Sequence, residues 1–331
     1  MDWGFIFEQT LIQALGLNAA VYAIAAIGLN LHFGYAGLLN FGQAGFVAMG
    51  AYGMGIAVNQ WGLPVWVAVL MGMAFATVFA LLLGIPTLRL RADYLAIVTI
   101  AAAEIVRLLA RSTAMRDLTR GAEGLNEFIG PFREFSPFDP SATYGIAFIQ
   151  YRGNTFFAVA VGWLLAALFV LITWLLIKSP WGRVVKAIRE DEYAARALGK
   201  NAYRFKMQVL IIGGVMGGFA GMVDALGKAT VQPDFFAASL TFFFWLVLII
   251  GGVGKVWAPI VGSMIYWGLI TFVQNTGRQL VDNGIIQPSF MDTSQIDQIR
   301  YWIVGAALAL LMVFRPQGIF GNREEMALDA R

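Results

Sequence analysis

The 331-residue chain is 59% hydrophobic and only 13% charged, and its mean hydropathy is +0.70. Because soluble domains carry about 25% charged residues, this composition excludes an ordinary soluble domain and predicts a membrane protein. The chain has no cysteine and one histidine, so disulfides, thiolate catalysis and cysteine-based or clustered-histidine metal sites are excluded and no cofactor is expected. Its formal charge of +3 fits the basic cytoplasmic loops of membrane proteins and gives no support for nucleic-acid binding.

Apolar runs of about 20 residues recur along the chain, and a helix of this length crosses roughly 30 Å of hydrocarbon. They predict an all-α fold, a single transmembrane domain over residues 1–331 with about nine membrane helices (a range of about 8–10), some of them broken. The predicted spans are 10–31, 35–58, 64–88, 94–110, 155–177, 206–227, 240–254, 258–277 and 301–314. Since Asp2 and Glu8 replace the basic start of a signal peptide, the first span is expected to stay in the protein.

Charge sets the expected orientation. The segment 178–206 holds eight Lys or Arg against three acidic residues, which predicts a cytoplasmic position. Alternation of the spans then places the N-terminus outside, residues 111–154 in an extracytoplasmic loop and the C-terminus in the cytoplasm. With this orientation the inside segments carry 14 basic residues and the outside segments carry eight, which is the expected bias.

The apolar stretch "GYAGLLNFGQAGFVAMGAYGMG", residues 34–55, contains seven glycines, although glycine weakens a helix by roughly 1 kcal/mol relative to alanine. Two interpretations stay open at this point. Small residues spaced four apart, such as Ala44 and Ala48, allow a neighbouring helix to pack closely. Alternatively, the helix is broken and lines a pathway, with Asn30, Asn40 and Gln43 on the pathway side.

The basic segment 178–206 is rich in helix-forming residues, and Gly199 followed by Asn201 supplies a stop signal. It predicts a short helix on the cytoplasmic face. Ala194, Ala195 and Leu198 form a small apolar stripe between charges. This stripe fits either an amphipathic connector in the lipid headgroups or a docking helix for a soluble partner.

Charged residues inside the predicted spans are few. Glu104 and Arg107 stand three apart, and Asp224 and Lys228 stand four apart, so each pair lies on one helix face and can neutralise itself. A part in gating or substrate passage is the alternative for both pairs. The single histidine, His32, has no obvious partner in the sequence and is expected to serve in packing or at the interface.

The string "GGVGK" at 251–255 fails as a phosphate-binding loop. Such a loop needs Gly, four residues, then Gly-Lys followed by Ser or Thr, whereas Val256 follows the lysine here. A glycine-rich break between two membrane segments is the better interpretation. Any ATP on which the protein depends is therefore expected to be hydrolysed by another chain.

Several blocks along the chain resemble, in order, the LivM-type permease subunits of bacterial ABC importers for branched-chain amino acids. The blocks are "GLNLHFGYAGLLNFGQAGFVAMGAYGMG" (28–55), "LRLRADYLAIVTIAAAEIVRLL" (88–109), "WGRVVKAIREDEYAARALGKNAYRFKMQVL" (181–210), "PDFFAASLTFFFWLVLIIGGVGKVWAPIVGS" (233–263) and "FRPQGIFG" (314–321). Together they cover almost the whole chain, and their combination is specific although each alone is not.

This resemblance implies a multi-pass subunit of the bacterial inner membrane that performs no chemistry on its substrate. The implied partners are a second, related permease, two cytoplasmic ATPases and an extracytoplasmic solute-binding protein. The substrate implied is a branched-chain or other neutral amino acid, while related permeases serve urea and more distant ones serve sugars. Thr99 and Glu104, within the second block, are expected to join the pathway residues.

The resemblance also assigns the cytoplasmic helix as the element that couples to an ATPase. The usual pattern in such permeases is Glu-Ala-Ala, three residues, then Gly, and Ala194, Ala195 and Gly199 keep this spacing. Tyr193 stands in place of the glutamate, which leaves the part played by the preceding Glu192 open. The expected coupling residues are Glu192, Ala194, Ala195, Leu198 and Gly199.

Two other classes of protein are weighed against an ABC permease. A secondary transporter or channel predicts a paired internal repeat with carboxylates near the membrane midplane, and Glu104 is the one plausible carboxylate. A membrane-embedded enzyme predicts a polar catalytic cluster at one membrane face, against which the histidine and cysteine counts argue.

Overall fold

The computed structural model describes residues 2–90, 92–126, 128–146, 149–283, 293–315 and 318–321, and it is mainly helical. The longer helices are α1 (Trp3–Ala14), α2 (Leu17–Asn30), α3 (Gln43–Asn59), α4 (Val65–Thr87), α5 (Ala92–Arg111), α8 (Gly153–Lys178), α9 (Pro180–Glu190), α11 (Ala202–Lys228), α12 (Ala238–Gly251), α13 (Ala258–Asp282) and α14 (Thr293–Phe314). The shorter ones are η1 (Leu31–Tyr35, a π-helix), η2 (Thr113–Met115), α6 (Arg116–Thr119), η3 (Gly121–Glu123), α7 (Gly130–Glu134), α10 (Glu192–Ala197) and η4 (Pro233–Phe236).

Four short strands complete the described residues. They are β1 (Leu125–Asn126), β2 (Thr143–Ile146), β3 (Ile149–Arg152) and β4 (Thr230–Val231). Strand β1 pairs antiparallel with β4, with Leu125 opposite Val231, and β2 pairs antiparallel with β3. The β1–β4 pair joins the loop 111–154 to the end of α11, so this loop is fixed to the bundle.

A helical membrane bundle is the observed architecture. Within the described residues, four helices are long and apolar enough to cross a membrane: Leu17–Tyr35, Val65–Thr87, Gly153–Lys178 and Ala202–Lys228. Helices α4 and α8 lie at the periphery and expose large apolar side chains, with Leu82 and Leu164 exposed by 68% and 69%. Such side chains suit contact with lipid. The total of about nine spans stays a prediction.

The predicted first span, 10–31, is divided in the structure. Helix α1 ends at Ala14 and α2 begins at Leu17, with Gly16 between them. The carbonyl oxygen of Leu15, freed by this break, accepts a hydrogen bond of 2.7 Å from the indole Nε1 of Trp163 on α8. Apolar composition continues through Gly16, so hydropathy alone could not locate the division.

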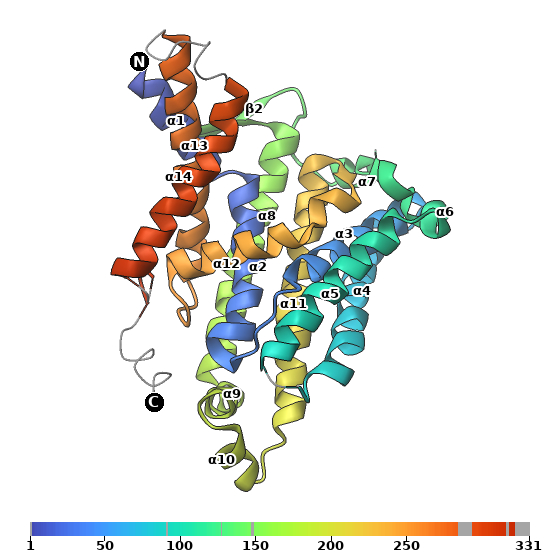
Figure 1. Ribbon diagram of the computed structural model, residues 1–331. Coiled ribbons are helices and arrows are strands. Elements are labelled where there is room, and N and C mark those ends of the chain that lie inside the picture. Colours follow the sequence, from blue (N-terminus) through green and yellow to red (C-terminus); the bar gives the residue numbers. More distant parts are fainter. Residues whose placement is uncertain are drawn as a thin grey trace.

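Helices α2, α3 and α11 form the centre of the bundle (Figure 1). Their close approach depends on glycine: a Cβ built on Gly50 of α3 would lie 2.1 Å from the carbonyl oxygen of Gly218 on α11. A Cβ on Gly221 would lie 1.9 Å from the carbonyl oxygen of Val47. Backbone therefore meets backbone here, which explains the glycines of α3 by close packing.

The two ends of the bundle differ. Helices α6 and α7 and strand β2 lie at the end where α1 begins, whereas α9 and α10 lie at the opposite end (Figure 1). Residues 111–154 and the N-terminus thus share one end, and the membrane side on which this end lies stays a prediction. The C-terminal residues 322–331, expected on the side of α9 and α10, lie outside the described residues.

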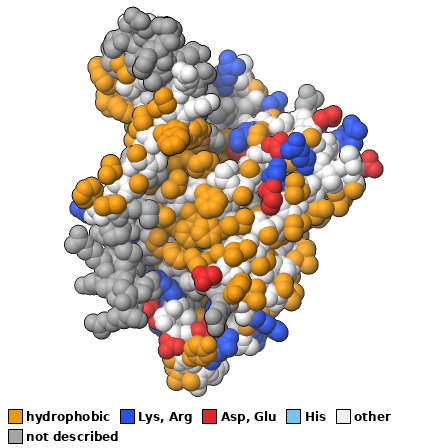
Figure 2. Space-filling view, viewed as in Figure 1, with side chains coloured by type: hydrophobic (Ala, Val, Ile, Leu, Met, Phe, Trp, Pro, Cys, Tyr) orange, Lys and Arg blue, Asp and Glu red, His pale blue; other side chains and the backbone are white. Residues whose placement is uncertain are grey.

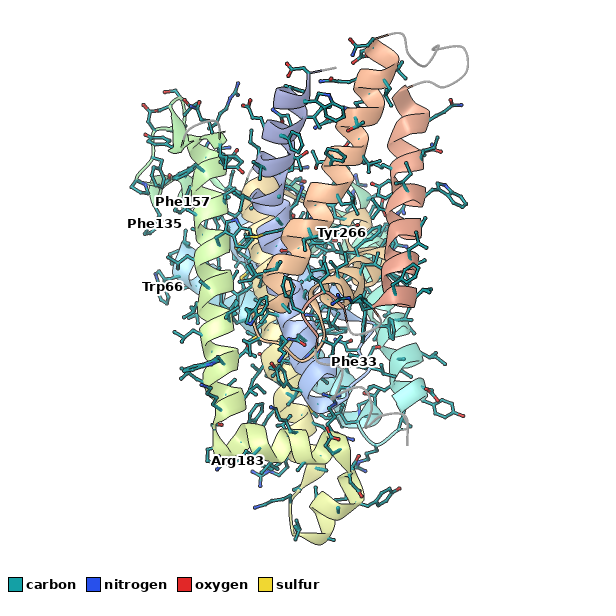
Figure 3. All side chains as sticks on the ribbon, turned by 90° about the vertical axis from the view of Figure 1, so that its left-hand side faces the viewer. Phe33, Trp66, Phe135, Phe157, Arg183 and Tyr266 are labelled. Carbon is teal, nitrogen blue, oxygen red and sulfur yellow. The ribbon has the colours of Figure 1, made fainter. Side chains whose placement is uncertain are left out.

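Helix α9 turns crosswise beneath α8 at the lower end, where Arg183 marks it (Figure 3). Ser179 caps the helix by accepting a hydrogen bond from the backbone N–H of Gly182, and Pro180 occupies the first helical position. Val185 and Ile188 of α9 are buried against the bundle, whereas Arg183, Lys186 and Glu190 are exposed. The basic segment thus forms two helices, α9 and α10, where the sequence predicts one.

Candidate functional site

The helix break in the glycine-rich stretch lies at residues 37–42, between η1 and α3. Its backbone groups find partners on neighbouring helices. The N–H of Phe41 donates to Oγ1 of Thr99 on α5 at 3.0 Å, and the carbonyl of Asn40 accepts from Nε1 of Trp245 on α12 at 3.2 Å. Helices α5 and α12 therefore help to hold the break in place, because backbone polar groups in an apolar interior need hydrogen-bond partners.

A buried polar cluster supports the break from inside. The amide Nδ2 of Asn40 lies 3.0 Å from Nδ1 of His32 and 3.0 Å from Oε1 of Gln43. The side chain of Gln43 in turn donates to the carbonyl oxygen of Ala25 at 3.2 Å. His32 Nε2 lies 3.2 Å from the carbonyl oxygen of Leu210. This arrangement favours a neutral imidazole that accepts at Nδ1 and donates at Nε2.

These contacts show the surroundings of His32, Asn40 and Gln43, which the sequence left open. His32 serves in packing, as predicted, but it has two polar partners where none was expected. The side chains of Asn40 and Gln43 are fully enclosed in this conformation, at 1% and 0% exposure. Their predicted contact with a substrate pathway stays a prediction, and what they do here is to fix the broken segment.

Asn30 links the same region to the "GGVGK" string. Its Nδ2 donates to the carbonyl oxygen of Lys255 at 2.8 Å, and its Oδ1 accepts from the N–H of Gly254 at 2.9 Å. These residues connect α12 to α13, so the string forms a break between two helices. The end of α2 is thereby tied to the start of α13.

Replacement of Asn40 by Leu is expected to lower stability by about 1–3 kcal/mol, because the variant leaves His32 Nδ1, Gln43 Oε1 and the Gly42 N–H without a partner. The melting temperature of the purified chain, measured by tryptophan fluorescence, checks this. The matched control is Asn59→Leu, which removes an exposed hydrogen bond to the Asn126 carbonyl. Equal melting temperatures of the two variants would contradict the structural part assigned to Asn40.

A network of four charged residues lies on α5 and η4. Glu104 pairs with Arg107 at 2.5 Å, which confirms the predicted pair. Arg107 and Arg111 also reach the carboxylate of Asp234 at 2.9 and 3.1 Å. Sequence reasoning missed Asp234 because it stands more than a hundred positions away. Figure 2 shows acidic and basic side chains over the upper part of α5, beside a broad apolar surface.

Of the five predicted pathway residues, Glu104 reaches the surface, with 35% of its side chain exposed. Thr99 is buried and faces the break. Asn30, Asn40 and Gln43 are buried beside it. The structure therefore brings four of the five residues together around residues 37–42 and places Glu104 further along α5.

Helix α10 presents a different surface from the predicted one. Tyr193 and Leu198 are exposed by 84% and 80%, whereas Ala195 is buried against Ile188 of α9 and Ala202 of α11. Ala195 therefore faces the bundle in this chain, and its predicted part in coupling to an ATPase stays a prediction. Ala194 is exposed beside Tyr193.

Gly199 and Glu192 shape the ends of α10. Gly199 has φ +76°, and the N–H of Lys200 donates to the carbonyl oxygen of Ala195 at 3.1 Å, which is a glycine-dependent helix stop. Glu192 pairs with Arg196 at 2.5 Å and also contacts Lys206 on α11. Glu192 thus fastens α10 to α11, which gives this residue a structural part that the sequence left open.

Helix α9 connects α10 to the helix break. Nη1 of Arg189 donates to the carbonyl oxygen of Gly34 in η1 at 2.6 Å, and the ammonium of Lys186 lies 5.7 Å from the ring centroid of Tyr35. Indole Nε1 of Trp181 donates to Gln208 on α11 at 2.8 Å. A displacement of α9 would therefore act directly on η1 and on α11.

Comparison with known proteins decides the family. Residues 11–314 match the family described as branched-chain amino acid transport system / permease component. The chain belongs to this permease family.

The permease is similar to the high-affinity branched-chain amino acid transport system permease protein LivM of Escherichia coli K12, at 30% identity over 96% of this chain and 71% of the relative. It is also similar to LivH of the same strain, at 24% identity over 96% of each chain. The nucleoside ABC transporter permease protein NupC of Lactococcus lactis is 24% identical over 92% of this chain and 95% of the relative. No solved structure matches. As a member of this family, the permease is a transport component and not an enzyme.

Proposed function

We propose that this permease is the membrane subunit of an ATP-driven importer for branched-chain or other neutral amino acids. It forms the translocation pathway together with a second, related permease in the bacterial cytoplasmic membrane. Two cytoplasmic ATPases supply the energy, and an extracytoplasmic binding protein delivers the substrate. The observation that carries this proposal is the family match over residues 11–314.

The proposed second permease is supported by the relatives. LivM and LivH of E. coli carry the same system name and are both similar to this chain, so two related permeases belong to one named system. A surface of this chain must then face a partner or a wet pathway and not lipid.

The surface over α5, η4 and α12 fits that description best. It carries Glu104, Arg107 and Asp234, with 59% of the Asp234 side chain exposed. Charges at membrane depth are costly in lipid and are found where they face water, other charges or protein. The exposed apolar residues beside them, Ile97 at 64% and Phe242 at 47%, suit contact with a second helical subunit.

The proposed ATPase contact lies on α10. An exposed apolar pair, Tyr193 and Leu198, at the far end of the α9–α10 segment suits a groove on a soluble partner. The Arg189 contact to η1 supplies a route from that partner to residues 37–42.

The proposed orientation places residues 111–154 outside and α9–α10 in the cytoplasm. In this cysteine-free chain, cysteine at the exposed Glu134 is expected to react with an impermeant thiol reagent in intact cells, whereas cysteine at the exposed Lys200 reacts only after permeabilisation. Mass-shift labelling measures both. The reverse pattern would overturn the orientation, and with it the assignment of α10 to an ATPase.

A nucleoside is the second candidate substrate, because NupC is similar over nearly the whole chain. Urea is a further alternative. The test is uptake of labelled leucine, guanosine and urea by cells that lack their own high-affinity systems and carry this chain with its partner subunits. Leucine uptake that disappears when this chain alone is omitted is the expected result, and uptake of guanosine or urea without leucine would overturn the amino-acid assignment.

A further inference from the structure

A cavity of about 280 Å³ lies where α2, α3, α11, η4, α12 and α13 meet. Its walls are mostly apolar and aromatic, with Tyr22, Phe243, Phe244 and Trp267 among the lining residues. Its volume is close to the lower end of ligand pockets, about 300 Å³, so it suits a small solute.

Two acidic side chains, Asp224 and Asp234, and one basic side chain, Lys228, line the cavity. Asp224 of α11 is buried, with 11% of its side chain exposed, and it pairs at 2.8 Å with Nζ of Lys228, which is 38% exposed. The Lys228 ammonium also lies 4.9 Å from the ring centroid of Phe235 in η4. The predicted pair is therefore present, but it borders an open space, which neutralisation alone would not require.

Trp267 supplies a second, independent observation. It lines the cavity, and within the described part of the chain its buried indole Nε1–H has no hydrogen-bond partner. A buried donor without an acceptor costs free energy, so an acceptor group of a bound ligand would satisfy it. The cavity thus offers the Lys228 ammonium, the carboxylates of Asp224 and Asp234, and an unused donor around a mostly apolar space.

We infer that this cavity is a binding site for a free neutral amino acid within the permease, an inference that rests on the proposed function. The ligand's carboxylate binds the Lys228 ammonium, and its α-ammonium binds the Asp224 carboxylate, so the zwitterion inserts into the existing ion pair. Its apolar side chain packs against Tyr22 and Phe244. Two adjacent opposite charges with an apolar tail match this arrangement, whereas neither urea nor a nucleoside carries such a pair of charges.

The position of the cavity connects it to the proposed pathway surface. Asp234 lines the cavity and also accepts from Arg107 and Arg111 on α5. Phe235, beside it, faces Lys228. The residues of η4 thus form the boundary between the cavity and the charged surface of α5.

The test measures binding of labelled leucine to the assembled permease complex in nanodiscs, without ATP and without the binding protein. The competitors are 4-methylpentanoate, which lacks the amino group, and 3-methylbutylamine, which lacks the carboxylate. We expect leucine to bind and each competitor to be weaker by about tenfold or more, since each lacks one charge-assisted contact. The inference would be overturned if both competitors displaced labelled leucine as well as unlabelled leucine does, or if leucine did not bind at all. Stronger competition by guanosine, added as a further competitor, would also overturn it.

Variants of the Asp224–Lys228 ion pair provide a second test of the inference. Lys228→Gln and Asp224→Asn are each expected to weaken leucine binding by about tenfold or more. The matched control, Arg116→Gln, removes one charge from the exposed pair with Glu123 and leaves binding unchanged. Wild-type affinity in both ion-pair variants would also overturn the inference. If a variant fails to assemble, the competitor series on the wild-type complex still decides.

Uptake separates this inference from the proposed function. If wild-type cells import leucine in an ATP-dependent manner but the complex gives no charge-selective binding, the inference is contradicted and the proposed function is retained. If leucine is not imported at all, the proposed function itself is contradicted.

Discussion

The substitution Leu198→Glu is expected to abolish substrate-stimulated ATP hydrolysis and uptake while the two permeases still insert and pair. Leu198 is 80% exposed at the end of α10, so a charge there does not disturb the fold of this chain. In the proposed complex it enters an apolar groove of the ATPase, where loss of a central apolar contact costs about 2 kcal/mol or more. ATPase activity of the reconstituted complex, with and without loaded binding protein, measures the effect.

The conservative change Leu198→Met is the matched control, because it keeps an apolar side chain of similar volume. It is expected to retain most of the coupled activity. Normal stimulation of ATP hydrolysis in Leu198→Glu would show that α10 does not couple to an ATPase.

Ala195→Trp has a different expected outcome. Ala195 is 4% exposed and packs between α9 and α11, so a larger side chain there separates the two helices. The yield of folded chain falls before any contact with a partner is tested. The two residues therefore distinguish loss of docking from loss of local packing, although the sequence places both on one stripe.

Gly50→Leu is expected to prevent folding of the bundle. A Cβ at this position would lie 2.1 Å from the carbonyl oxygen and 2.4 Å from the Cα of Gly218, and neither is a flexible side chain that can move aside. Separation of α3 from α11 would open the centre of the bundle, at a cost of about 3 kcal/mol or more. Yield and monodispersity after detergent extraction measure the result.

Gly130→Leu is the control for this prediction. Gly130 is exposed in the loop 111–154, and a Cβ on it meets nothing within 4 Å. We expect yield and melting temperature close to wild type. If Gly50→Leu gives the same yield as Gly130→Leu, the backbone contact between α3 and α11 is not present in the folded protein.

Local patterns in the sequence predicted local structure. The spacing of Glu104 and Arg107, and of Asp224 and Lys228, predicted ion pairs that the structure confirms. The glycines of residues 34–55 left packing and a broken helix as alternatives, and the structure contains both: α3 packs closely on α11, and residues 37–42 break the helix. The patterns that predicted these features are formed by residues a few positions apart.

Contacts between distant segments could not be predicted in this way. The stripe of Ala194, Ala195 and Leu198 gave no sign that Ala195 faces inward, because its orientation is set by Ile188 and Ala202 on two other helices. Likewise the partners of Asn40 lie on several elements, and a carboxamide in an apolar run suits a wet pathway and a buried network equally. At the division beside Gly16, the partner of the Leu15 carbonyl is Trp163, 148 positions after Leu15.

The most direct test of the central claim is labelled leucine uptake into proteoliposomes that contain this permease, its second permease and its ATPases, with loaded binding protein on the opposite side from ATP. Leucine is expected to accumulate when ATP faces the ATPases, to be unaffected by ionophores, and to be absent with a non-hydrolysable ATP analogue. Uptake driven by an ion gradient without ATP, in vesicles that hold this chain alone, would contradict an ATP-driven importer and identify a secondary transporter.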